Sequence, residues 1–566
     1  MMPNSMKRFL IILLSSISTI NMHADITAGK TYRIVLEQNA GKTLFVKNAS
    51  LDEKAPVVLW TDTDVPAQQW TVLDAGNGEV CFRNVYTGMY LDASSMSLAQ
   101  RTSPSAWSLV PVDGQDNVYH LKQQKRFLRV AATLDGAQPT VGSSAQNWLF
   151  IEVEPRESFD EMARRRMIDG FLNQYVQFKG QSYRTFMNGG WGEAETMETV
   201  LDCYEATKDA ALLTIFEQCY LYMRYHVGPT WNGGTIVADY HWFGYDFNDD
   251  VMWLIIAAIR GYQATGKQMY LDDAKRNFDL IYSRAYLGYV GLLRWAEHTG
   301  DRNGANSCIN GPAEVAACYI AAATGDESYY EKARELYENQ RQYLFDPVTG
   351  HVDDSVVFNP NTGQVTSRNS WASTYNQGTM LGAAVLLHRH YGTDQYKQDA
   401  NRILAFAKRE LCNAHGIVHV CQNADGDFQG FKGILMRYAG LYARSYQDVS
   451  TQKWLIANAF HAYNNLNSMS YGHSAWLTKA SENGMYNDVD YTSAGSAFGA
   501  STALSAACGV PVDHYYGDDT AIHPHTIRDE KACQQDSRSF LLSGQQVKHP
   551  RSGQLIIRGG KKYIVR

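Results

Sequence analysis

The chain has 566 residues, of which 45% are hydrophobic and 19% charged, and its formal net charge is -7. A chain of this length is expected to fold as two or three domains. The modest negative charge, without a long basic run, excludes an electrostatic footprint for nucleic acid or for an anionic membrane surface, so we expect a neutral partner. Aromatic residues make up 12% of the chain, which suits surfaces that stack on flat apolar faces such as sugar rings.

The first residues predict a secretory signal peptide over 1–24. A basic segment precedes an apolar stretch from Phe9 to about Ile20, and Ala24 supplies a small residue for cleavage. The apolar stretch is too short to stay in a membrane as a span. We therefore expect a secreted protein, periplasmic or at the cell surface, with no integral span after cleavage and no cysteine for a lipid anchor at this site.

Residues 25–155 predict an all-β domain built from three repeats. The segment is rich in β-branched, aromatic and turn-forming residues and has no sustained helical period. Each unit ends in a tryptophan, at Trp70, Trp107 and Trp148. A period near 40 residues with several short strands per unit is typical of a repeat architecture.

The repeat endings resemble the Gln-x-Trp motif of the ricin-type β-trefoil. Gln68 with Trp70 and Gln146 with Trp148 match the motif, whereas Ser105 replaces the glutamine of the middle repeat. In that family the motif packs the shared core, so we interpret these residues as markers of the fold and not as ligands. The sequence leaves open whether the domain binds sugar or acts as a spacer.

From 156 to 512 the pattern changes to amphipathic helices, with a domain boundary near Pro155. Segments 262–282, 321–340 and 388–408 each contain a helix, a Gly turn, a Tyr and, four residues later, an Ala on a second helix. A looser copy of this pattern at 204–219 adds a fourth turn. Counting back from these four turns, and adding two later helices, places six helix starts near Trp191, Asp249/Asp250, Asn310, Asn376, Phe431/Lys432 and Tyr491/Thr492. Six helical hairpins predict an (α/α)6 toroid, whose inner helices collect their N-terminal ends at one face.

The tail, 513–566, predicts a linker and a small β-rich segment of two or three strands, because it alternates and is punctuated by Gly. It resembles the small C-terminal β-modules of secreted bacterial proteins, which suggests a role in sorting.

The chain contains four Asp-Asp pairs, at 249/250, 272/273, 353/354 and 518/519. The pair at 272/273 is expected on the solvated face of an outer helix. The pair at 353/354 lies in a turn-rich loop that faces water or binds a metal, and 518/519 lies in the C-terminal linker. Asp249 and Asp250 alone fall at the start of a predicted inner helix. An aspartate there can simply cap the helix, but this pair also lies on the face where the other helix starts should converge.

Two close carboxylates among aromatic residues suit glycoside hydrolysis. One attacks or polarises the anomeric carbon, and the other protonates the leaving oxygen. A short carboxylate separation, about 5–5.5 Å, is typical of enzymes that retain the anomeric configuration. Mutual repulsion is also expected to raise the pKa of one carboxyl, which keeps it protonated as an acid.

Four blocks in the same order resemble glycoside hydrolase family 76, the endo-α-1,6-mannanases, over about 160 to 510. They read "YDFNDDVMWLIIAAIRGYQATG", "CINGPAEVAACYIAAATGD", "STYNQGTMLGAAVLLHRHYG" and "GFKGILMRY". The resemblance implies an (α/α)6 fold, hydrolysis of the α-1,6-mannan backbone and retention of configuration. It also implies Asp249 as the nucleophile and Asp250 as the acid/base, although the sequence leaves the order of these roles open.

Further residues are expected to contact the substrate: Trp191, Tyr245, Asn310, Tyr375, Asn376, Gln377 and Lys432. Trp191 would stack on a mannose or pack the first inner helix. Tyr245, with His241 and Trp242, would form a subsite wall or part of the core. The amides of "TYNQG" would hydrogen-bond sugar hydroxyls, whereas Asn310, Tyr375 and Lys432 can also be explained as local caps or pairs. Lys432 could alternatively form a salt bridge with a catalytic carboxylate.

We expect a monomer that needs no cofactor or metal, since no phosphate loop, Ser-His-Asp arrangement or metal-ligand spacing is found. The nine cysteines are odd in number, and Cys412 and Cys421 could close a loop. Two other functions remain possible from the sequence. One is a transglycosidase of the same family, and the other is a catalytically silent mannan-binding protein, against which the intact aspartate pair argues. Endo or exo action is not fixed by the sequence.

Overall fold

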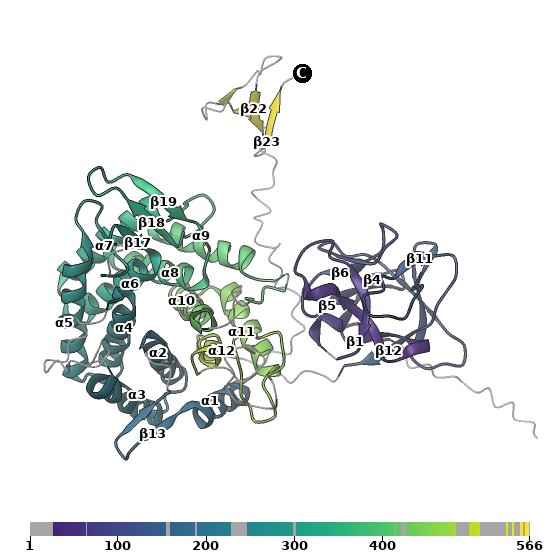
Figure 1. Cartoon of the computed structure of the whole chain (residues 1–566), viewed down its shortest axis with the longest axis horizontal. Helices are drawn as coiled ribbons and strands as arrows, with labels where there is room; N and C mark the ends of the chain where they lie inside the picture. The colour runs from purple at the N-terminus through teal and green to yellow at the C-terminus, as the bar shows by residue number, and fades with distance from the viewer. Residues whose placement is uncertain are drawn as a thin grey trace, which may run out of the picture. The chain divides into compact units, whose positions relative to one another are not determined.

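The computed structural model describes residues 26–63, 65–153, 159–186, 190–227, 246–297, 302–413, 415–419, 426–480, 482 and 497–509, together with four strands between 539 and 564. The chain divides into two compact units, Met1–Pro155 and Arg156–Arg566 (Figure 1). The expected signal peptide, Tyr245 and the pair at 518/519 lie outside the described residues.

The N-terminal unit is all β, as predicted, and its strands pair antiparallel. They are β1 (Thr31–Leu36), β2 (Lys42–Val46), β3 (Val57–Thr61), β4 (Gln69–Gly76), β5 (Glu79–Asn84), β6 (Tyr90–Asp92), β7 (Ala99–Arg101), β8 (Ser108–Pro111), β9 (Val118–Gln123), β10 (Arg126–Arg129), β11 (Thr140–Gly142) and β12 (Trp148–Glu152). The first strand pairs with the last, in a register that sets Tyr32 opposite Glu152 and Leu36 opposite Trp148.

The three repeat tryptophans lie fully buried in one hydrophobic core. Each indole N–H donates to the carbonyl of a leucine in its own repeat, so the same hydrogen bond occurs three times. The bonds run from Trp70 to Leu44 (3.4 Å), from Trp107 to Leu91 (2.9 Å) and from Trp148 to Leu128 (3.2 Å). The motif is therefore part of the packing, because a buried indole N–H needs a partner.

The middle repeat compensates for the glutamine that Ser105 replaces. In the third repeat, Gln146 accepts a backbone N–H of its own repeat at 2.7 Å. In the middle repeat the corresponding N–H, from Ala93, is instead accepted by Gln123 of the third repeat at 2.9 Å. Ser105 donates its hydroxyl to Asp92 at 2.6 Å. The departure from the motif thus leaves this backbone group satisfied.

The second unit contains, in its described part, twelve α-helices. They are α1 (Glu161–Tyr175), α2 (Gly190–Thr207), α3 (Ala210–Tyr222), α4 (Asn248–Thr265), α5 (Gln268–Ala285), α6 (Ser307–Thr324), α7 (Glu327–Tyr343), α8 (Thr374–Tyr391), α9 (Asp394–Glu410), α10 (Phe431–Tyr446), α11 (Val449–Asn464) and α12 (Ala497–Cys508). The even-numbered helices pack each against the next, and α12 packs against α2, so the inner ring closes (Figure 1). The odd-numbered helices lie outside this ring, and the arrangement is the predicted (α/α)6 toroid.

The three helix turns that identified the hairpins end in left-handed glycines. Gly266, Gly325 and Gly392 follow α4, α6 and α8 with φ of 70°, 73° and 68°. Each cap N–H donates to a carbonyl four residues earlier in its helix, a conformation that glycine adopts without a Cβ penalty. This local chemistry explains why the sequence repeat indicated the hairpins.

Helix starts agree with the predictions at α2, α4, α8 and α10 to within two residues. Asn310 is an exception, because α6 begins at Ser307 and this asparagine lies inside its first turn. The start expected near Tyr491/Thr492 lies outside the described residues, and the last inner helix is described from Ala497 onward.

The sequence predicted that Asp272 and Asp273 both face solvent, but this prediction is wrong for Asp273. Asp272 is exposed, whereas Asp273 is buried and bound by Arg224 at 2.7 Å and by the Tyr220 hydroxyl at 2.9 Å. Asp399 on α9 repeats this arrangement with a tyrosine and an arginine of α7. The aspartate is therefore a recurring link between neighbouring outer helices.

Short strands complete the second unit. Those among the helices are β13 (Gln177–Lys179), β14 (Tyr183–Thr185), β15 (Tyr286–Leu287), β16 (Leu292–Leu293), β17 (Gly304–Asn306), β18 (Ser355–Phe358) and β19 (Val365–Asn369). The C-terminal segment forms a four-stranded sheet, more than the two or three strands predicted, from β20 (Ser539–Phe540), β21 (Gln546–Val547), β22 (Leu555–Arg558) and β23 (Lys561–Ile564). Within the described ranges, no helix is both long and apolar enough to cross a membrane.

Candidate active site

The start of α4 is fixed by Asn248, which is fully buried. Its backbone N–H donates to the Trp295 carbonyl at 2.8 Å. Its side-chain amide donates to the Arg294 carbonyl at 3.1 Å and to Glu297 at 3.0 Å, and its oxygen accepts from Arg284 at 2.7 Å. These bonds hold the first turn of α4, and with it the next two residues, against the segment that follows β16.

Asp249 and Asp250 occupy this first turn, where the helix dipole favours acidic side chains. Asp249 is only 9% exposed, whereas Asp250 is half-buried. Burial raises the pKa of Asp249 to about 7, and hydrogen bonds from the Cys308 thiol and the Trp295 indole partly oppose the rise. The rise therefore falls on Asp249, the residue expected as the nucleophile, and its main cause is desolvation instead of the mutual repulsion that the sequence predicted.

Cys308, in the first turn of α6, connects Asp249 with residues of α8. Burial raises the pKa of the Cys308 thiol, and the charges of Asp249 and Asp354 add to the rise. The Tyr375 hydroxyl, in the first turn of α8, hydrogen-bonds the same thiol. The pKa of Tyr375 is raised by burial and by the charges of these two aspartates. The N-terminal ends of α4, α6 and α8 thus meet around Asp249, as the predicted toroid requires.

Asp354 is a third acidic residue at this face, which the sequence assigned to a solvent-facing or metal-binding loop. Its carboxylate accepts from Asn369 at 3.0 Å, from Ser355 at 3.1 Å and from the Asn376 amide at 3.4 Å. Burial raises its pKa. The sequence could have indicated this location, because Asp354 precedes α8 and the segment before each inner helix leads to the same face.

The described residues contain no cluster of three or more His, Cys, Asp or Glu side chains that could bind a metal. The metal-binding alternative for Asp353/Asp354 therefore finds no ligand set there. Asp353 instead pairs with Arg368.

An aromatic wall joins α2, α8, α10 and α12. Trp191, at the start of α2, is half-buried and donates its indole N–H to Asp427 at 3.0 Å. Its ring meets Phe498 edge to face at 4.6 Å and lies 5.9 Å from Phe431. Tyr375 stacks on the other side of this group, 3.9 Å from the Phe431 ring with an interplanar angle of 13°. The structure therefore shows the packing of Trp191 against the inner helices, whereas its stacking on a mannose stays a prediction.

Asn310 has a structural role instead of the expected substrate contact. It is fully buried, and its amide exchanges hydrogen bonds with the backbone N–H and carbonyl of Leu293 at 2.8 and 3.0 Å. It also donates to the Asn306 carbonyl at 2.9 Å. The amide therefore ties β16 to α6, and a sugar hydroxyl would have to displace these bonds.

Gln377 also has a structural role instead of the expected substrate contact. In the orientation that satisfies both of its groups, the fully buried amide donates to the Gly350 carbonyl at 3.0 Å and accepts the Val352 N–H at 2.7 Å. It anchors the loop that leads to Asp354, and its amide is engaged by backbone groups of that loop. Asn376, its neighbour, is the residue of "TYNQG" that contacts Asp354.

Lys432 is buried and contacts Trp476 and Val418. Its expected contact with the substrate or with a catalytic carboxylate stays a prediction. Its ammonium lies 3.6 Å from the centroid of the Trp476 ring and donates to the Val418 carbonyl at 3.3 Å. A cation over an indole face is a stable arrangement for a buried lysine. These contacts account for its burial by packing within the helical unit.

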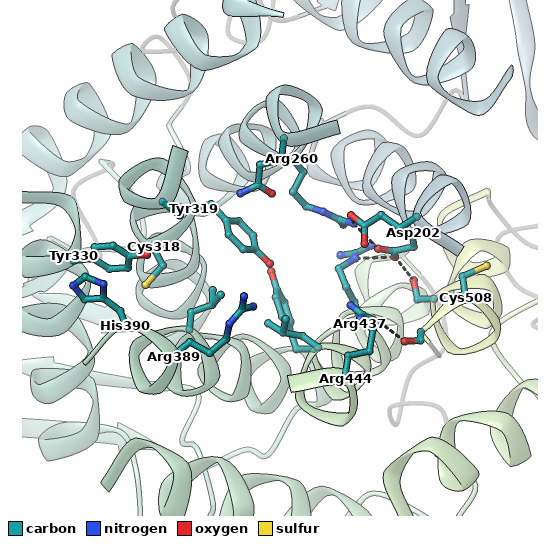
Figure 2. A pocket seen from close by; sticks show the side chains of 18 residues that line it. Asp202, Arg260, Cys318, Tyr319, Tyr330, Arg389, His390, Arg437, Arg444 and Cys508 are labelled. Atoms are coloured by element: carbon teal, nitrogen blue, oxygen red, sulfur yellow. Dashed lines mark hydrogen bonds and ion pairs between the residues drawn. The ribbon is translucent and has the colours of Figure 1, made fainter. Parts of the chain in front are cut away.

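A cavity of about 460 Å³ lies at the other end of the inner ring, and Figure 2 shows its lining. Most of the residues that line it come from the C-terminal halves of the inner helices, and Tyr330 comes from the outer helix α7. Arg260, on its wall, follows Asp249 by eleven positions, which places the two roughly 16 Å apart along α4 at the rise of an α-helix. This cavity is therefore separate from the aspartate pair.

Two arginines of this cavity, Arg260 and Arg437, pair with buried carboxylates of α2. Arg260 binds Asp202 at 2.8 Å, and Arg437 binds Asp202 at 2.9 Å (Figure 2). Arg260 also binds Glu198 at 3.0 Å, and Arg437 binds Glu195 at 2.6 Å. All five are buried. The network links α2, α4 and α10 across the middle of the ring, so its first role is to hold the toroid together.

Comparison with known proteins identifies related chains for both units. The model of glycosyl hydrolase family 76 matches residues 161–509, and that of the ricin-type beta-trefoil lectin domain-like family matches residues 22–107. The mannan endo-1,6-alpha-mannosidase DCW1 of Candida glabrata is 28% identical over 179 residues, which are 30% of this chain and 40% of that protein. The Saccharomyces cerevisiae protein of the same name is 27% identical over 192 residues, 32% of this chain and 42% of that protein. The chain thus spans less than half the length of these curated relatives.

Among solved structures, the α-1,6-mannanase GH76A of a Salegentibacter species is similar in fold. It is 25% identical, with a TM-score of 0.51, and the match covers 62% of this chain and 99% of that one. The same enzyme has been solved as inactive variants in which two consecutive aspartates are replaced, one of them in complex with α-1,6-mannotetrose.

Proposed function

Because the chain belongs to glycosyl hydrolase family 76, we propose that it hydrolyses the α-1,6-mannosidic bonds of a mannan backbone with Asp249 and Asp250. One observation carries this proposal: the two aspartates are consecutive in the first turn of an inner helix, at the face where three helix starts meet. The Salegentibacter mannanase supports it, because replacing two consecutive aspartates inactivates that enzyme.

The proposed mechanism is a double displacement that retains the anomeric configuration. Asp249 attacks the anomeric carbon while Asp250 protonates the oxygen of the leaving sugar, which gives a covalent mannosyl-enzyme. Asp250 then removes a proton from water, which attacks the same carbon and releases Asp249. Each carboxylate ends the cycle in the state in which it began.

The surroundings of the two carboxyls support this assignment of roles. Asp249 is buried and accepts from the Trp295 indole and the Cys308 thiol, and such donors orient an ionised oxygen for attack. Asp250 is half-buried, so it can exchange its proton with water between the two steps. A proton donor that must be reloaded in every cycle is better placed at the more accessible position.

The walls around the pair suit a neutral sugar. Trp191 and Tyr375 offer aromatic faces from α2 and α8. Asp354 offers a carboxylate to sugar hydroxyls, and the buried side-chain oxygen of Asn376 has no partner among the described residues. We propose Trp191, Tyr375, Asp354 and Asn376 as the substrate contacts. Asn310 and Gln377 do not share this role, because their amides are bound within the protein.

The remaining assignments follow the sequence. We propose that residues 1–24 direct export, which suits an enzyme whose substrate is a polymer that a cell meets outside its cytoplasm. We propose that residues 25–155 bind carbohydrate or act as a spacer for the catalytic unit. A binding measurement of the full chain and of a chain lacking this unit on insoluble mannan distinguishes these two roles.

The test of the proposed function is hydrolysis of linear α-1,6-mannan, followed by proton NMR of the anomeric signal as product first appears. We expect oligosaccharides whose new reducing ends are α, with no release from β-1,4-mannan as the control. Products with β ends would contradict the retaining mechanism, and no release would contradict the activity. Products longer than the substrate would identify a transglycosidase instead.

A further inference from the structure

Two thiols meet at the end of the inner ring that is opposite to the aspartate pair. Cys203 lies near the end of α2, and Cys508 is the last residue of α12. Their sulfurs are 3.7 Å apart, although the residues are 305 positions apart in sequence. Both are buried, and Cys508 also lines the ring's rear cavity, on the same side as Asp202 (Figure 2). The contact therefore joins the first and the last inner helix.

The two helices are already held in place on both sides of this contact. Ser505, one turn before Cys508, donates to Asp202 at 3.2 Å, and its hydroxyl lies 3.3 Å from that of Thr199. The Arg164 guanidinium of α1 donates to the Ala507 carbonyl at 2.9 Å. A disulfide has its sulfurs about 2.05 Å apart, so closing the gap requires a combined movement of less than roughly 2 Å.

We infer that Cys203 and Cys508 form a disulfide bond in the exported protein. The oxidant is a thiol oxidoreductase of the extracytoplasmic compartment, which carries its own disulfide. The thiolate of one cysteine attacks that disulfide and forms a mixed disulfide. The second cysteine then displaces the oxidoreductase. Two protons leave the cysteines, their two electrons pass to the oxidoreductase, and its dithiol is the reduced product.

The other thiols of the described chain offer no second pair. Cys81 lies in the N-terminal unit, and the remaining thiols of the helical unit, at 219, 308, 318 and 412, have no sulfur partner among the described residues. Cys412 donates to the Ala407 carbonyl instead. Cys421, with which Cys412 could close a loop, lies outside the described residues. The observed contact therefore selects one pair from the scattered cysteines.

Burial determines when the bond can form. The hydrogen bond with Cys508 and burial raise the pKa of the Cys203 thiol well above its usual range. Because only the thiolate attacks a disulfide, oxidation of the folded protein is slow, and the bond forms while α12 is still docking. Once formed, the bond is equally hidden from reductants. It would join the beginning and the end of the helical unit and so close the ring covalently.

A peptide map of the full chain tests this inference. The protein is exported to the periplasm of a bacterium with an active thiol oxidoreductase, denatured without reductant in N-ethylmaleimide, and digested. We expect a peptide linked through Cys203 and Cys508 that disappears after reduction. Recovery of both cysteines fully alkylated before reduction would overturn the inference. The wild-type chain decides the question, so no variant has to fold.

Thermal unfolding gives an independent measurement. We expect the exported protein to melt several degrees above the same protein refolded in dithiothreitol, because a cross-link between distant residues restricts the unfolded chain. In the double variant Cys203→Ala/Cys508→Ala this difference should vanish, whereas Cys318→Ala, a buried thiol on α6 with no sulfur partner, should keep it. An equal difference in the double variant would assign the effect to other cysteines and contradict the inference.

Discussion

At the residue scale, the chemistry rests on how Asp249 is desolvated. The carboxyl is buried in the first turn of α4, and burial moves its pKa to about 7 in spite of two hydrogen-bond donors. A nucleophile must be ionised. With a pKa of about 7, this carboxyl is ionised in about half of the free enzyme at neutral pH. Burial disfavours the charged carboxylate, so the group takes up a proton at a higher pH than an exposed aspartate does.

This position of the pKa predicts the acidic limb of the pH profile. Below pH 7 the attacking carboxylate is progressively protonated, so kcat/KM should fall by about tenfold for each further pH unit on this limb. Above pH 7 Asp249 is ionised and no longer limits the rate. Initial rates on linear α-1,6-mannan between pH 4 and 9 measure this profile. A rate that is constant from pH 5 to 7 and falls above 7 would instead identify Asp249 as the acid.

Asn248 is predicted to act as a positioning residue. The variant Asn248→Ala removes the three side-chain hydrogen bonds that fix the first turn of α4. We expect kcat to fall on the order of a hundredfold through misplacement of the aspartates, with little change in KM. Asn458→Ala is the matched control, because Asn458 is equally buried and hydrogen-bonded but belongs to the outer helix α11. Equal losses of kcat in the two variants would show that only stability is affected.

At the scale of the elements, close approach between inner helices sets the dimensions of the ring. A Cβ on Gly378 of α8 would lie 2.8 Å from the backbone of Leu435 on α10. These two backbones can approach each other because Gly378 has no side chain. The ring thus brings the helix starts together by packing, and the helix ends are joined by the network around Arg437.

The variant Gly378→Ala should therefore destabilise the helical unit by about 1–3 kcal/mol, since backbone atoms cannot move aside as a flexible side chain would. Gly288→Ala is the control, because the nearest atom to its new Cβ is a Tyr286 ring carbon at 3.7 Å. Urea unfolding measures both free energies. A loss for Gly378→Ala no larger than that of the control would contradict the argument.

The sequence predicted the hairpins because their signals are local. Gly266 and its counterparts stop a helix wherever they occur, and the same spacing recurs along the chain. The sequence could not predict which amides face inward. Asn310 and Asn376 both follow the start of an inner helix, yet one bonds β16 and the other bonds Asp354. That difference depends on where neighbouring loops pack. The same is true of Asp273, whose burial is set by a tyrosine of α3 and an arginine that follows this helix.

At the scale of the whole molecule, the chain consists of two compact units, each with its own packing. The trefoil-like unit is centred on three tryptophans that share one hydrophobic core. The helical unit is closed by the contact of α12 with α2. The division explains how both architectures could be identified from separate repeats, one near 40 residues with tryptophans and one with Gly turns.

Calorimetry of the full chain should resolve this division. The variant Trp148→Ala leaves a large cavity and the Leu128 carbonyl without its indole partner, which should destabilise the first unit by about 3–5 kcal/mol. We expect one transition to move to lower temperature while the transition of the helical unit and the rate on soluble mannan stay constant. A shift of both transitions would contradict independent folding of the units.

The most direct test of the catalytic assignment is the rate of oligosaccharide release from linear α-1,6-mannan by Asp249→Asn and Asp250→Asn. Asp272→Asn is the matched control, because Asp272 belongs to another Asp-Asp pair and is exposed on α5. We expect each of the first two variants to stay folded and to lose at least about a thousandfold in kcat, since an amide can neither attack nor donate the proton. The control should keep the wild-type rate. Release at the wild-type rate by either Asp249→Asn or Asp250→Asn would contradict the catalytic assignment.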